Sequence, residues 1–124
     1  MKNDKKTVLI VEDDSMISSM YKTKLDASGF SVLTADNGAD GLETAKGEKP
    51  DLILLDVILP QLDGFSVLEE LKKDEKTKNI PVIVLTNLGT EEDFDKGKKL
   101  GAVDYIVKAN LTPADVIDKV TKYI

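Results

Sequence analysis

The sequence predicts an α/β fold in which helices cover both faces of a parallel β-sheet. Five short apolar runs alternate along the chain with five segments of helical character, most of them joined by short loops. A short apolar run between turn-forming residues is typical of a strand buried on both faces, as in the middle of a parallel sheet. Alternation of such strands with helices predicts βαβ units and therefore a doubly wound sheet.

Length and composition limit the possible functions. The 124 residues suit a single domain, residues 1–124, that needs no metal or disulfide in order to fold. The chain contains no cysteine and no histidine, which excludes thiol chemistry, a phosphohistidine and an imidazole base. Proton transfer is left to carboxylates, lysine or water. No residues follow the last predicted helix, so we expect no DNA-binding or enzymatic output domain in this chain, which is either a stand-alone domain or one cut from a longer protein.

Charge and hydropathy bear on partners and location. The net charge of −6 argues against nonspecific binding to nucleic acid or to an anionic membrane. No apolar run approaches membrane-spanning length, and the first six residues lack the apolar segment of a signal peptide. We therefore expect a cytoplasmic protein with no direct nucleic-acid or membrane partner.

The elements are predicted from apolar spacing and capping residues. Strands are expected at residues 7–11, 30–35, 51–56, 80–86 and 103–107. Helices are expected to start at the caps Ser15, Asp63, Thr90 and Thr112, and after the turn Asp36-Asn37-Gly38. Apolar residues keep helical spacing in the first helix at Ile17, Met20, Tyr21 and Leu25. The inner side of the last helix is predicted to carry Val116, Ile117, Val120 and Ile124.

Two helices are expected to be weakly held. The helix that ends near Gly47 carries Gly38 and Gly41 in its first turn and has a small apolar face. The helix at residues 90–100 has only Phe94 and Leu100 as large apolar residues, so it should be able to move.

Polar residues follow four of the five predicted strands. The flavodoxin-like strand order 2-1-3-4-5 places strands one, three, four and five side by side. Glu12 and Asp13 follow strand one, Asp56 ends strand three, Thr86 ends strand four and Lys108 ends strand five. Taken singly, these residues could be caps, turn formers or solvated charges. Together they lie at the carboxyl edge, where open α/β sheets bind ligands.

The chemistry of this cluster follows from its charges. Three carboxylates repel one another, so they require a cation or a raised pKa. Mg²⁺ prefers oxygen ligands, and with Lys108 it would balance the three acids. Such a site could stabilise an incoming phosphoryl group, with a hydrogen bond from Thr86. Asp56 is then the natural nucleophile, and the product would be an aspartyl phosphate.

The ordered set of motifs resembles the receiver domain of two-component response regulators, of the chemotaxis-regulator-like kind. The resemblance covers the chain from residue 6 or 7 to residue 124 and is specific because of its spacings. The segments that carry it are residues 8–14, Leu54-Leu55-Asp56 with Pro60 and Asp63-Gly64, Leu85-Thr86, Gly101-Ala102 and residues 104–108.

The resemblance implies a role for each site residue. Asp56 would accept a phosphoryl group, and Thr86 and Lys108 would contact it. Glu12, usually through water, Asp13, Asp56 and the backbone carbonyl of Ile58 would hold Mg²⁺. Tyr105 would be the aromatic residue that turns inward on activation; read from the residues alone, it could equally be a half-buried strand aromatic with its hydroxyl in water.

The resemblance also implies a signalling function. The donor would be a histidine kinase or a histidine phosphotransfer protein, and the chain would catalyse only its own phosphorylation and dephosphorylation. Residues 90–100, Tyr105 and residues 112–124 would form the face that switches binding of a downstream protein, and a phosphorylation-dependent homodimer is possible.

Four positions near the predicted site affect its details. Ala109 replaces the proline usual after the strand-five lysine, so we expect a trans peptide bond and a different loop shape. Asn87 follows the switch threonine, where a small residue is common. By resemblance, Ile58 and Leu88 border the path of the hydrolytic water, and their bulk predicts a long-lived phosphoryl group.

Two alternative functions require residues or losses that this chain does not show. A phosphatase of the haloacid dehalogenase type needs a second acid two residues after the nucleophile, where this chain has Ile58. A pseudo-receiver binding module, which is never phosphorylated, usually lacks one of the acids, the threonine or the lysine. None of them is missing here.

Overall fold

The computed structural model describes residues 5–59, 62–86, 90–108 and 112–124. Strands and helices alternate as predicted, and the strand starts differ from the predicted ones by at most two residues. The strands are β1 Thr7–Val11, β2 Ser31–Ala35, β3 Leu52–Asp56, β4 Val82–Thr86 and β5 Asp104–Val107. The helices are α1 Ser15–Ala27, α2 Gly38–Glu48, α3 Gly64–Lys73, α4 Glu91–Lys99 and α5 Pro113–Tyr123.

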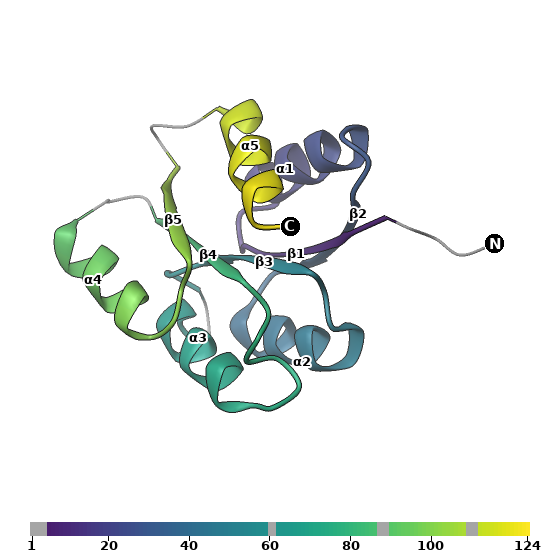
Figure 1. Ribbon diagram of the computed structural model, residues 1–124. Coiled ribbons are helices and arrows are strands. Elements are labelled where there is room, and N and C mark those ends of the chain that lie inside the picture. Colours follow the sequence, from purple (N-terminus) through teal and green to yellow (C-terminus); the bar gives the residue numbers. More distant parts are fainter. Residues whose placement is uncertain (1–4, 60–61, 87–89, 109–111) are drawn as a thin grey trace.

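The sheet is parallel throughout and has the predicted order β2-β1-β3-β4-β5. Figure 1 shows α1 and α5 on one face of the sheet and α2 and α3 on the other, with α4 beside β5. The pairing register places Val11 opposite Leu55, Asp56 opposite Leu85 and Thr86 opposite Val107. The carboxyl ends of four neighbouring strands therefore reach the same edge of the sheet.

The core has two halves, one on each face of the sheet. Side chains alternate along each strand, so Leu9 and Leu55 pack on the side of α2 and α3, whereas Ile10 and Leu54 pack on the side of α1 and α5. All five residues of β3 and of β4 are buried. The buried central strands therefore form a rigid base for the polar residues at their ends.

The helix caps agree with the sequence predictions except at α1. Asp63, Thr90 and Thr112 cap α3, α4 and α5, and Thr112 forms a capping box with Asp115. The prediction that Ser15 caps α1 is wrong. Asp14 is the cap, because its carboxylate accepts hydrogen bonds from the backbone N–H groups of Met16 and Ile17.

Not every apolar position of α1 is buried. Met20 is 45% exposed, and Ser18, Tyr21 and Leu25 are the buried residues of the helix. These three are spaced by three and four residues, so they form one stripe facing the sheet. Met20 lies beside that stripe, toward solvent with Met16.

The glycines at the start of α2 allow close packing. A Cβ atom on Gly38 would lie 2.1 Å from the carbonyl oxygen of Leu62, and one on Gly41 would lie 2.8 Å from Val11. Any larger residue would push α2 away from α3 and from β1. Whether α2 is loose, as its glycines alone would suggest, stays a prediction.

The described part of α4 has few buried residues. Gly97 is its only buried residue, and Phe94 and Leu100 are partly exposed. The thin apolar face expected from the sequence is thus confirmed. In the described residues, no helix combines the length and the apolar character needed to cross a bilayer.

Candidate functional site at the carboxyl edge of the sheet

The sheet brings the predicted polar residues together. Glu12, Asp56 and Thr86 are buried, with exposures of 2%, 4% and 1%, although each carries a polar side chain. Asp13 follows Glu12 and is exposed. A buried polar group requires partners, and all buried side-chain nitrogen and oxygen atoms of the described residues have one.

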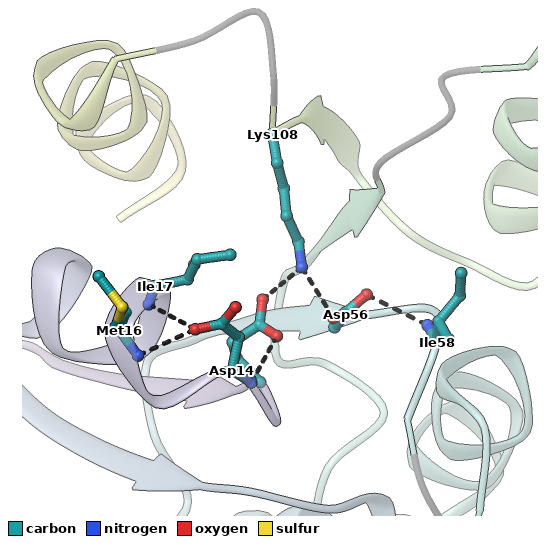
Figure 2. A network of polar contacts seen from close by, with 7 residues as sticks. Asp14, Met16, Ile17, Asp56, Ile58 and Lys108 are labelled. Atoms are coloured by element: carbon teal, nitrogen blue, oxygen red, sulfur yellow. Dashed lines mark hydrogen bonds and ion pairs between the residues drawn. The ribbon is translucent and has the colours of Figure 1, made fainter.

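Lys108 connects the ends of three strands. Its ammonium donates a hydrogen bond to Oδ2 of Asp56 at 2.8 Å and a short one to Oε1 of Glu12. Figure 2 shows the lysine side chain extending from the end of β5 toward the acids. The lysine side chain is only 7% exposed, so both ion pairs are shielded from water.

Backbone groups fix the two buried acids. The N–H of Asp14 donates to Oε2 of Glu12 at 3.1 Å, and the N–H of Ile58 donates to Oδ1 of Asp56 at 3.1 Å. Figure 2 shows the contact between Ile58 and Asp56 beside the lysine. Each acid therefore has one oxygen on a backbone donor and the other on Lys108, so its orientation is fixed before any ligand binds.

Gly64 lets the loop after β3 pack tightly against Asp56. A Cβ atom on Gly64 would lie 2.0 Å from the carbonyl oxygen of Asp56 and 2.5 Å from Cα of Val57, and the glycine N–H donates to Val57. Only glycine fits so close to another backbone segment. The sequence motif contained this glycine, but its packing role was not foreseen.

The acids have the arrangement of a divalent cation site. Glu12, Asp13 and Asp56 each offer a carboxylate oxygen, and these oxygens lie within 4.8 Å of one another. Three acids face one ammonium, so a divalent cation would complete the charge balance. The ligands are hard carboxylate oxygens, which Mg²⁺ prefers. One of the three acids is exposed, which leaves room for water in the coordination shell. The residues therefore fit the predicted metal.

Burial and neighbouring groups shift the pKa values of Glu12 and Lys108. Burial, which disfavours the charged form, raises the pKa of Glu12 to about 7, and the neighbouring Asp56 adds to the increase. Hydrogen bonds from Lys108 and from the N–H of Asp14 act in the opposite direction. Burial also opposes the charge on Lys108, but hydrogen bonds to Asp56 and Glu12 outweigh it and raise the lysine pKa. Lys108 is therefore a fixed positive charge.

Tyr105 lies away from the acids. It is 41% exposed, and its ring stacks on Phe94 of α4 with the ring centroids 3.6 Å apart. The ammonium of Lys119 lies 5.7 Å from the centre of the Tyr105 ring and donates to Asp104 at 2.9 Å. In this structure the aromatic side chain is thus in an outward position. Sequence reasoning missed these partners, because nothing in the spacing links Phe94 or Lys119 to Tyr105.

Several predicted details are not tested. Asn87, Leu88 and Ala109 lie outside the described residues. The backbone carbonyl of Ile58 stays a predicted metal ligand; the side chain of Ile58 is 61% exposed.

Fold and site together define the class of protein: a flavodoxin-like α/β domain with an acidic pocket and a lysine at the carboxyl edge of its parallel sheet. The model of the response regulator receiver domain matches residues 8–121. The chain therefore belongs to the family of response regulator receiver domains, which act in two-component systems.

Known proteins agree with this assignment. The probable transcriptional regulator ycf27 of Pyropia yezoensis is 41% identical over 108 residues, which are 87% of this chain and 43% of the relative. The chain thus spans less than half the length of that regulator. The chemotaxis protein CheY4 of Vibrio cholerae has a similar structure, with a TM-score of 0.91, 28% identity and coverage of 97% of this chain and 99% of that one.

A second similar structure contains a metal ion. It is the receiver domain of the sensor histidine kinase PA1611 of Pseudomonas aeruginosa, described with a magnesium ion coordinated in the active site cleft. Its TM-score is 0.87 at 26% identity, with coverage of 96% of this chain and 97% of that one.

Proposed function

We propose that the chain is the phosphoacceptor domain of a two-component phosphorelay, in which Asp56 takes a phosphoryl group from a phosphohistidine donor. The observation that carries the proposal is the buried Asp56 carboxylate held by Lys108, with Glu12 on the same ammonium. A structural ion pair would need one acid, whereas this lysine serves two acids beside a third. Such an excess of carboxylates suits a site that takes up a cation and a phosphoryl group.

The donor would be a histidine kinase or a histidine phosphotransfer protein. A bond forms between a carboxylate oxygen of Asp56 and phosphorus, and the phosphorus–nitrogen bond of the phosphohistidine breaks. The leaving imidazole keeps the electron pair and is protonated by solvent. Because this chain contains no histidine, the phosphohistidine must lie outside these 124 residues.

The chain's own residues position and neutralise the reacting groups. Lys108 already lies at Asp56 and can follow the new phosphoryl oxygens with its ammonium. Thr86, buried at the end of the neighbouring strand, can donate its hydroxyl to one of those oxygens. Glu12, Asp13, Asp56 and the carbonyl of Ile58 would hold Mg²⁺, which supplies positive charge for the phosphoryl oxygens.

We further propose that phosphorylation changes binding of a downstream protein at α4, β5 and α5, by way of Thr86 and Tyr105. The outward position of Tyr105 supports this, because it leaves an inward position available. The chain would catalyse only its own phosphorylation and dephosphorylation, act in the cytoplasm, and could form a homodimer when phosphorylated.

The haloacid dehalogenase alternative has no support, since the exposed Ile58 cannot act as an acid or base.

Phosphorylation by a small-molecule donor tests the proposal. Incubation with acetyl phosphate and Mg²⁺ should add one phosphoryl mass, and Asp56→Asn should abolish the addition. Asp118→Asn is the matched control, because Asp118 is an exposed acid of α5 and is not one of the site residues. Labelling that persists in Asp56→Asn would show that another residue is the acceptor, and no labelling of the unmutated chain would favour the pseudo-receiver.

A further inference from the structure

A groove between α4 and β5 is hollowed beside the proposed switch residue. This α4–β5 groove has a volume of about 490 Å³. Its apolar lining includes Phe94, Ala102, Val103, Tyr105 and Tyr123. Val103 and Tyr105 are 42% and 41% exposed, which is high for large apolar residues. The apolar surface is thus open to solvent and suited to contact with another protein.

The rim of the groove on α4 is acidic. Glu91, Asp93 and Asp95 line it, and the lysine among its lining residues is Lys98. Among the described residues, none of these three carboxylates forms an ion pair. Their charges are therefore available to a partner.

The acid on the β5 side of the groove is already paired. Asp104 accepts hydrogen bonds from Lys119 and from the hydroxyl of Tyr123, both at 2.9 Å. Burial opposes ionisation of Asp104, but these hydrogen bonds outweigh it and lower the pKa of the carboxyl. The negative charge offered to a partner therefore comes from α4.

The edge of β5 is partly covered from within the chain. Lys119 donates to the backbone carbonyl of Tyr105 at 3.3 Å, so this carbonyl is engaged by α5. A partner strand that extended the sheet would have to displace the lysine. Recognition through side chains lying in the groove is the better fit.

We infer that the α4–β5 groove receives a segment of a downstream protein that carries lysine or arginine beside an aromatic or large aliphatic side chain. The apolar side chain would contact Phe94 and Val103, and the cations would lie against Glu91, Asp93 and Asp95. This inference rests on the proposed function and specifies the partner of its output face.

The acidic rim of the groove favours a basic partner over the other possible occupants. Nucleic acid would bring phosphates to the acidic rim, which is unfavourable. A second copy of the chain would bring another groove with three unpaired acids and one lysine, so the two surfaces would repel. A basic segment is attracted by the acidic rim.

Selection from a displayed library of random twelve-residue peptides tests the inference. The chain is used as the target with and without Mg²⁺ and beryllofluoride, the phosphoryl mimic. Enriched peptides should be basic and contain an aromatic or large aliphatic residue. They should bind Asp95→Lys at least tenfold more weakly than the unmutated chain. Glu43→Lys, the same change on an exposed position of α2, should bind like the unmutated chain.

The outcomes distinguish this inference from the proposed function. Enrichment of neutral or acidic peptides, binding that Asp95→Lys leaves unchanged, or no enrichment would overturn the basic-partner inference. So would light scattering that shows a dimer dissociated by Asp95→Lys, because a second copy would then occupy the groove. A charge preference that is equal with and without beryllofluoride would support the inference while contradicting a phosphorylation-controlled output face.

Discussion

Phe94 and Tyr105 stack face to face, with ring centroids 3.6 Å apart and ring planes inclined by 16°. The contact joins a partly exposed residue of α4 to an exposed residue of β5, so it links the least buried helix to the proposed switch. Lys119 approaches the same tyrosine ring from α5. The outward position of Tyr105 is therefore held by groups from two helices.

Removing the stack should favour the inward position of Tyr105. An aromatic pair contributes about 0.5–1.5 kcal/mol beyond its area, so Phe94→Ala should shift the equilibrium by up to about tenfold. Without beryllofluoride, amide NMR signals of residues 86–105 should move toward their beryllofluoride-bound positions, and those of residues 36–47 should stay. Phe94→Tyr keeps the ring and should resemble the unmutated chain. Unchanged signals in Phe94→Ala would show that the stack does not hold the tyrosine.

Mg²⁺ should stabilise the folded chain, because only the folded state gathers the acids. The free energy of unfolding should rise by roughly 2–3 kcal/mol at about one hundred times the dissociation constant. Asp13→Asn should be more stable than the unmutated chain in EDTA, since it removes a repulsive charge, and should lose the Mg²⁺ effect. Urea unfolding in EDTA and in Mg²⁺ measures both. Identical curves for the unmutated chain would argue against a metal site.

Glu12 should make the metal-free chain less stable as the pH rises. Its pKa is raised from 4.5 to about 7 in the folded state, so between these values the folded state binds more protons than the unfolded state. Stability from this group is complete below about pH 4.5 and is lost as the pH approaches 7. In EDTA the loss should be of order 1–3 kcal/mol relative to Glu12→Gln, whose residue 12 does not titrate. Parallel pH profiles of the two proteins would contradict the raised pKa.

Gly64 should tolerate no side chain. Gly64→Ala would place a Cβ atom 2.0 Å from the carbonyl oxygen of Asp56, so we expect a loss of about 2 kcal/mol or more in stability and slower phosphorylation of Asp56. Gly47→Ala in α2 is the control, because nothing lies within 4 Å of its Cβ position. It should be neutral or stabilising by up to about 1 kcal/mol. Equal melting temperatures for the two variants would show that the loop can move away.

The phosphoryl group should be long-lived if bulk near the acceptor restricts water. Ile58, which follows Asp56 by two residues and cannot orient water, is one such group, and Leu88 is the other by resemblance. The double variant Ile58→Asn, Leu88→Glu should lose its phosphoryl group faster after the donor is removed. Loss at the same rate would make Asn87 the next residue to test.

The sequence predicted which polar residues gather at the carboxyl edge of the sheet, because the topology determines their placement. Once β1, β3, β4 and β5 are neighbours in a parallel sheet, Asp56, Thr86 and Lys108 must share an edge, whatever the details of their loops. The cap of α1 was predicted wrongly because Asp14 and Ser15 are both good caps, and only the backbone geometry selects Asp14. The Phe94–Tyr105 stack depends on where α4 lies against β5, and no local pattern encodes that placement.

Lys108 has a further consequence for how the chain is made. Its two acid partners precede it by 96 and 52 residues, so during synthesis both carboxylates leave the ribosome long before their counter-charge does. A nascent chain that has completed only its first three strands carries the acids without the ammonium. Under the proposed function, competence for phosphorylation would therefore arise only when β5 has docked, and an unfinished or truncated chain would not draw phosphoryl groups away from finished molecules.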